Sequence, residues 1–173
     1  MYAVITGASS GIGEQFAERL AKEGYDLILV ARRRERLTAL SDKLKAAHKG
    51  LECDIFTADL MQLDECQRLS DYLEEKDIEI FINNAGYGDC GLFEETDIAK
   101  EMGMIDVNVR AVHFLTKKLL RQMRVKDRGF ILNVASSAGL IPAGPYMAAY
   151  YASKAYVASL SRAVACELRQ SHS

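Results

Sequence analysis

The chain has 173 residues, of which 49% are apolar and 27% charged, a composition typical of one soluble globular domain with a sizeable core. The formal net charge of −2 argues against nucleic acid or an anionic membrane as a partner. No signal peptide is visible, and no apolar stretch approaches the ~18 residues that a membrane-spanning helix needs. We therefore expect a cytoplasmic protein.

The cysteines and histidines show neither CxxC pairing nor clustering, so we expect reduced thiols and neither a bound metal nor a disulfide framework. The cysteines are Cys53, Cys66, Cys90 and Cys166, and the histidines are His48, His113 and His172.

Short apolar runs alternate along the chain with longer stretches of helical periodicity. Continuous apolar runs are typical of strands that are buried on both faces of a parallel sheet. We expect strands over 3–6, 27–31, 51–57, 78–82 and 130–134, the third being the weakest. We expect helices from Gly11 to a stop at Gly24, and over 33–47, 107–123 and 148–169. This alternation predicts a doubly wound α/β fold, and without repeats or linkers we expect residues 1–173 to form one domain.

A glycine-rich stretch, ITGASSGIGE, joins the first expected strand to the first expected helix. Its spacing, Gly7-x-x-x-Gly11-x-Gly13, is neither the G-x-G-x-x-G fingerprint nor a P-loop. Glycines nevertheless let the backbone turn tightly and approach a pyrophosphate, which the free N–H groups of a helix N-terminus attract. We interpret the stretch as a nucleotide site, with a plain turn as the alternative.

The second expected strand ends in a run of arginines. A cofactor with a free ribose 2′-hydroxyl usually meets an acid about 20 residues past the glycines, yet here Arg32 and Arg33 occupy that place. Guanidinium groups suit a 2′-phosphate through charge-assisted hydrogen bonds. The sequence therefore favours NADP(H) over NAD(H). The alternative is a solvated helix start whose charge is paired by Glu35 or Asp54.

Further polar motifs follow the later strands, at the edge where such sheets bind ligands. They are TADL with Asp59, INNAGYG from 82 to 88, DVNV with Asn108, NVASSAG with Ser136 and Ser137, and YYASK from 150 to 154. Together with TGASSGIG at 6–13, these motifs resemble the short-chain dehydrogenase/reductase family, in family order through the whole chain. The resemblance implies a Rossmann-type parallel sheet of order 3-2-1-4-5. It also implies hydride transfer between a nicotinamide cofactor and an alcohol or carbonyl.

The resemblance also assigns roles to individual residues. It implies that the pyrophosphate turn is formed by Gly7, Ser9, Gly11, Ile12 and Gly13, and that Arg32 and Arg33 face the 2′-phosphate. It also implies that Asp59 forms a hydrogen bond with the adenine, with Leu60 beside it. The residues implied to line the adenosine ribose and brace the sheet are Asn83, Ala85 and Gly86. It implies a catalytic tetrad of Asn108, Ser137, Tyr150 and Lys154, with Tyr150 and Lys154 also at the cofactor. Asn108 would hold a water that links Lys154 to solvent. The alternatives are that Asn83 and Asn84 cap strand ends and that Asn108 is an ordinary helix N-terminal residue.

Two adjacent tyrosines precede Lys154, and both are within its reach on a helix. The family pattern Tyr-x-x-x-Lys and the interval from Ser137 select Tyr150, which leaves Tyr151 for packing. A free phenol keeps its proton up to about pH 10. One ammonium at about 4 Å, at an effective dielectric near 20, supplies roughly the 4 kcal/mol that would bring its ionisation near neutral pH.

The sequence stops soon after the tyrosine helix, where family members continue with a sixth strand and a substrate loop. We therefore expect a C-terminally truncated chain, with the fifth strand at a sheet edge. We expect an NADP(H)-dependent oxidoreductase for a small carbonyl or alcohol, as a homodimer or homotetramer, with 141–147 as part of the pocket wall. The alternative is a non-catalytic dinucleotide-binding or dimerisation module.

Overall fold

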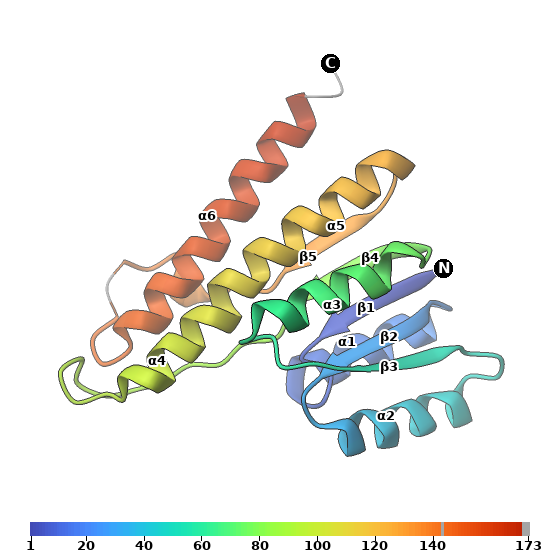
Figure 1. Ribbon diagram of the computed structural model, residues 1–173, viewed down its shortest axis with the longest axis horizontal. Coiled ribbons are helices and arrows are strands. Elements are labelled where there is room, and N and C mark those ends of the chain that lie inside the picture. Colours follow the sequence, from blue (N-terminus) through green and yellow to red (C-terminus); the bar gives the residue numbers. More distant parts are fainter. Residues whose placement is uncertain (143, 171–173) are drawn as a thin grey trace.

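The computed structural model describes residues 1–142 and 144–170, so His172 and the Ala143 of the expected pocket wall lie outside the described residues. Five parallel strands form one sheet in the order β3-β2-β1-β4-β5 (Figure 1). Their bounds are β1 Tyr2–Thr6, β2 Asp26–Ala31, β3 Cys53–Thr57, β4 Ile78–Asn83 and β5 Phe130–Asn133. This order confirms the fold class expected from the sequence.

Helices cover both faces of the sheet, because the central strands carry apolar side chains on both faces. Helices α1 (Gly11–Lys22) and α2 (Arg34–Ala47) pack on one face. Helices α3 (Leu63–Glu74) and α5 (Val112–Lys126) pack on the other. Helix α6 (Ala148–Gln170) lies beside α5 and contacts β5 (Figure 1).

The helix that carries Asn108 is longer than the sequence predicts. It begins with α4 (Ile98–Ile105), continues through a π-helical segment, η1 (Asp106–Ala111), and runs on into α5. The Asp97 side chain caps its start by accepting a hydrogen bond from the Ala99 amide at 2.8 Å. Asn108 therefore lies inside a helix rather than at its start. A π segment within an α-helix is frequent at functional sites.

Strand β5 lies at the edge of the sheet, as expected. Phe130 and Leu132 on this strand are 67% and 44% exposed, whereas Ile28 and Leu29 on the inner strand β2 are fully buried. An exposed apolar edge is a surface on which further polypeptide can pair.

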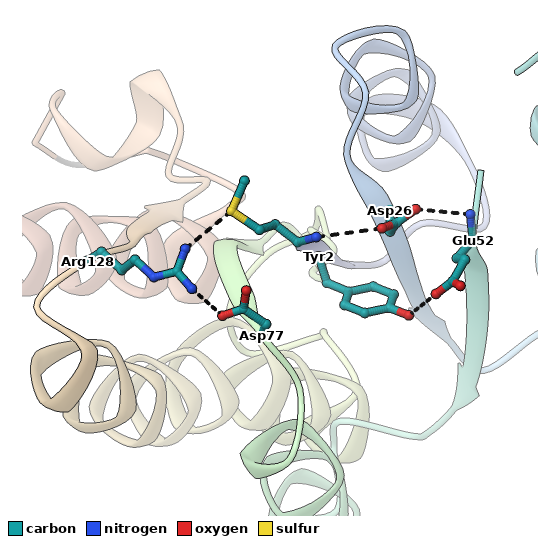
Figure 2. A network of polar contacts seen from close by, with 6 residues as sticks. Tyr2, Asp26, Glu52, Asp77 and Arg128 are labelled. Atoms are coloured by element: carbon teal, nitrogen blue, oxygen red, sulfur yellow. Dashed lines mark hydrogen bonds and ion pairs between the residues drawn. The ribbon is translucent and has the colours of Figure 1, made fainter. Parts of the chain in front are cut away.

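A polar network connects the strands at the end of the sheet where they begin, opposite the glycine turn (Figure 2). The Tyr2 hydroxyl donates a hydrogen bond to the Glu52 carboxylate, and Asp26 accepts one from the Glu52 amide at 3.0 Å. The bond to Glu52 raises the pKa of Tyr2 to about 12, because the neutral phenol is the better donor. Arg128, beside the start of β5, pairs with Asp77 before β4. These contacts connect β1, β2 and β3 to each other and β5 to β4.

Candidate functional site

The glycine turn after β1 brings the chain against the neighbouring strand end. Gly7 has a φ of +68°, and a Cβ there would lie 2.8 Å from the Ala85 Cα. A Cβ on Gly13 would overlap the carbonyl oxygen of Gly7. A side chain at either position would push the backbone segments apart. The turn therefore requires glycine at both positions, and it leads into the start of α1, where a helix N-terminus can bind an anion.

A cleft of about 420 Å³ opens at this edge of the sheet, beyond the carboxyl ends of the strands. The structure brings most of the expected cofactor residues into its wall: Gly7, Ser9, Ile12, Arg32, Arg33, Asp59, Leu60, Ala85, Gly86, Tyr150 and Lys154. Gly11, Gly13, Asn83, Asn108 and Ser137 are not among the residues that line it. The sequence did not single out Ser10, Met61, Tyr87 and Gly88, which do line it.

The two arginines line the cleft and make different contacts. The Arg33 guanidinium donates hydrogen bonds to the hydroxyls of Ser9 at 2.9 Å and Ser10 at 3.0 Å, across the glycine turn. That of Arg32 lies 4.0 Å from the Met61 sulfur. Within the described part of the chain, neither arginine forms an ion pair with a carboxylate. Asp54, one of the alternative partners, is instead bound to Lys76 at 2.9 Å.

The two asparagines at the end of β4 make different contacts. Asn83 is 3% exposed and donates hydrogen bonds to Thr116 on α5 at 3.0 Å and to Asn133 on β5 at 2.8 Å. Asn83 is not among the residues that line the cleft, and its side chain braces β4 against β5 and α5, while its role at the adenosine ribose stays a prediction. Asn84 lines the cleft instead and donates to the Thr6 carbonyl at 3.0 Å.

Tyr150 and Lys154 both line the cleft. The Lys154 ammonium lies 6.0 Å from the centre of the Tyr150 ring and donates a hydrogen bond to the Val134 carbonyl at 2.9 Å. Lys154 is 7% exposed, and this burial lowers its pKa. Gly88 leaves room for the Tyr150 ring, since a Cβ there would come within 3.1 Å of it. The Tyr151 ring packs against Gly144 and does not line the cleft.

Asn108 lies behind the cleft wall and is fully buried. Its amide nitrogen donates to the Tyr87 carbonyl at 2.9 Å and to the Ser153 hydroxyl at 3.1 Å. Its oxygen accepts from the Tyr87 amide at 3.1 Å. A Cβ on Gly86 would lie 2.6 Å from that oxygen and 3.7 Å from the Lys154 ammonium nitrogen. Asn108 and Lys154 therefore flank the same short stretch of backbone.

Ser137 is exposed and begins a short 3₁₀ helix, η2 (Ser137–Gly139), which packs against α6. Its neighbour Ser136 caps this helix by accepting from the Ala138 amide at 3.2 Å. Gly139 fits against the Lys154 backbone, since a Cβ there would lie 2.5 Å from the Lys154 carbonyl oxygen. The structure thus brings Ser137 close to the tyrosine helix but outside the cleft.

Neither a metal-binding cluster nor a membrane-spanning helix is found in residues 1–142 and 144–170. No group of three or more His, Cys, Asp or Glu side chains there could hold a metal ion. No helix in this part of the chain has the length and apolar character needed to cross a membrane. Cys53 and Cys66 are buried free thiols, and Cys90 and Cys166 are exposed ones.

An open parallel sheet with a glycine turn and a cleft at its carboxyl edge defines the class of dinucleotide-binding α/β proteins. Comparison with protein families narrows this class. The family model for short chain dehydrogenases matches residues 1–172. The chain belongs to the short-chain dehydrogenase/reductase family of oxidoreductases.

Individual relatives agree with this membership. The very-long-chain 3-oxoacyl-CoA reductase of Neurospora crassa is 34% identical over 172 residues, which are 97% of this chain and 52% of that protein. The bulky-bulky ketone specific alcohol dehydrogenase from Comamonas testosteroni superposes with a TM-score of 0.92 at 35% identity, over 98% of this chain and 68% of that one. A short-chain dehydrogenase from Sphingobium yanoikuyae, solved in complex with NADPH, has the same TM-score and identity, over 99% and 67%. The chain thus spans about half the length of the curated relatives it matches.

Proposed function

We propose that the protein is an NADP(H)-dependent oxidoreductase that interconverts an alcohol and a carbonyl compound. The observation that carries this proposal is a single cleft whose wall includes the glycine turn, the two arginines, Tyr150 and Lys154. The glycine turn and the two arginines fit a dinucleotide with an added phosphate. The bound nicotinamide would supply the hydride.

The chain's own contribution is proton transfer and orientation. Tyr150 gives its phenolic proton to the carbonyl oxygen as the carbon is reduced, and takes it back in oxidation. Lys154, held by the Val134 carbonyl, places its ammonium near that ring and favours the phenolate that is left behind. Ser137 serves as a donor to the substrate oxygen from beside the cleft, as charge develops there.

A pair of phenylalanine variants tests the proton-transfer role. In an assay with NADPH and a panel of aldehydes, ketones and hydroxy acids, Tyr150→Phe abolishes turnover, because the ring stays but the transferable proton is lost. Tyr151→Phe is the matched control and keeps most of the activity, because its ring packs against Gly144. Equal losses in the two variants would refute the assignment to Tyr150.

The preference for NADP(H) rests on the arginines. Both guanidinium groups line the cleft without a carboxylate partner among the described residues, so a 2′-phosphate can take that place. The Sphingobium relative, solved with NADPH, supports this preference. The substrate is a small-molecule carbonyl or alcohol, and Ile141, Pro142 and residues 144–147, which do not line the cleft themselves, would contribute to the substrate's wall. We infer a homodimer or homotetramer paired through α5 and α6.

A second candidate function is a dinucleotide-binding or dimerisation module without turnover. The exposed edge of β5 and the position of Ser137 outside the cleft favour it. Binding and catalysis separate the two candidates. The non-catalytic module is supported if the protein binds NADPH but reduces no compound of the panel, and if Tyr150→Phe binds NADPH equally well.

A further inference from the structure

Two serines tie helix α6 to the rest of the fold in the same manner. The Ser153 hydroxyl donates to the Tyr150 carbonyl at 2.7 Å and accepts from the Asn108 amide nitrogen at 3.1 Å. Two turns later, the Ser161 hydroxyl donates to the Val157 carbonyl at 2.7 Å and accepts from the Asn133 amide nitrogen at 3.0 Å. Only the first of these pairs stands behind the cleft.

Ser153 and the backbone of Tyr87 together fix which way the Asn108 amide faces. Its single hydroxyl proton is committed to the Tyr150 carbonyl, so it can only accept from Asn108. The amide nitrogen of Asn108 must therefore face α6, and its oxygen is left for the Tyr87 amide. The opposite orientation would set the nitrogen of Asn108 against the N–H of Tyr87. Ser153 is 3% exposed and Asn108 fully buried, so water cannot replace either bond without the site opening.

Asn108 in turn holds the cleft wall. It binds both backbone groups of Tyr87, and its oxygen lies against Gly86. Gly86 and Tyr87 both line the cleft. We propose that Ser153 is a positioning residue: by fixing the Asn108 amide it holds the Gly86–Tyr87 wall at a set distance from Tyr150 and Lys154. The nucleotide part of this inference rests on the proposed function.

The experiment compares Ser153→Ala with Ser161→Ala, which removes an equivalent pair of bonds outside the cleft. Amide hydrogen exchange of Tyr87 reads the wall directly, and fluorescence titration with NADPH reads the cleft. In Ser153→Ala we expect exchange at Tyr87 to be at least about tenfold faster and NADPH affinity about three- to tenfold weaker, because the buried hydrogen bond that anchors Asn108 to Ser153 is lost. Ser161→Ala leaves both within about twofold of the wild type, although it unfolds at lower urea.

Two further variants show whether Ser153 acts through Asn108. Ser153→Thr keeps the hydroxyl and restores both readouts, which a role in packing alone would not predict. In an Asn108→Ala background, Ser153→Ala changes neither readout further, because the amide it orients is gone.

Each result decides the question. Unchanged exchange at Tyr87 in Ser153→Ala, or an equal change in Ser161→Ala, overturns the proposal. Faster exchange with unchanged NADPH affinity overturns its extension to the nucleotide. A wild-type protein that binds no NADPH refutes the proposed function instead, and the exchange data then still decide whether Ser153 holds the wall.

Discussion

Replacing Gly7 by alanine tests whether the glycine turn is required by close approach as well as by its φ. At φ +68°, any other residue costs about 1–2 kcal/mol. The new Cβ would also lie 2.8 Å from the Ala85 Cα and 2.9 Å from the Asn84 side chain, within a closely packed wall. Overpacking of this kind adds about 1–3 kcal/mol. We therefore expect Gly7→Ala to lower the free energy of unfolding by roughly 2–5 kcal/mol.

Gly24→Ala is the matched control. Gly24 also has a positive φ, +89°, but no heavy atom lies within 4 Å of the position its Cβ would take. Only the backbone term of about 1–2 kcal/mol remains there. Urea unfolding followed by circular dichroism measures both variants, with equal m-values as the condition for comparing midpoints. Equal losses in the two variants would show that the wall yields at Ala85 and would refute the close-approach argument.

Three other expectations follow from named contacts. Arg33→Ala weakens NADPH binding about tenfold or more with little change in NADH binding, since a charge-assisted hydrogen bond contributes about 1.5–3 kcal/mol. Parallel titrations with NADPH and NADH measure both affinities. An unchanged preference for NADPH over NADH would contradict the assignment of Arg33 to the 2′-phosphate. Asn83→Ala lowers the free energy of unfolding by about 1–3 kcal/mol, because Thr116 and Asn133 each lose one buried hydrogen bond, while NADPH affinity stays the same. A loss of NADPH affinity in this variant would contradict the structural role of Asn83. Burial lowers the pKa of Lys154 in the folded protein. Between that lowered pKa and the ordinary value of ~10.4 the unfolded chain binds more protons, so the free energy of unfolding rises with pH across this window. Lys154→Met removes the rise in urea titrations at several pH values, and an identical pH dependence in both proteins would contradict the prediction.

The strands and their order were predictable because each strand is a short continuous apolar run and the motifs occur in family order. Helix α3 was missed, although its buried residues Cys66, Leu69, Ser70 and Leu73 recur at the spacing of an amphipathic helix. The start at Ile98 was missed because Gly103 interrupts the pattern of α4. A π segment has no hydrophobic period of its own, so nothing in the residue pattern marked η1.

The cleft was predictable to the extent that its residues are glycines, arginines or members of motifs at strand ends. The sequence could not predict which of Asn83 and Asn84 faces the cleft. Successive side chains at a strand end point to opposite faces, and the register decides which one faces the cleft. Ser153 was overlooked for a different reason. It contacts no ligand itself, and its importance comes from bonds to residues 45 positions away in sequence, which only the fold reveals.

The edge strand β5 has a consequence for the protein's behaviour in solution. Residues 130–135, Phe-Ile-Leu-Asn-Val-Ala, contain no charge and no proline, and such segments stack readily into intermolecular sheets when an edge is free. Lys126, Asp127 and Arg128 lie just before this segment, separated from it by Gly129, where charged gatekeeper residues are often found. Shelf life of the purified chain should therefore fall with protein concentration. It should fall faster in concentrated salt, where the gatekeeper charges no longer repel approaching copies.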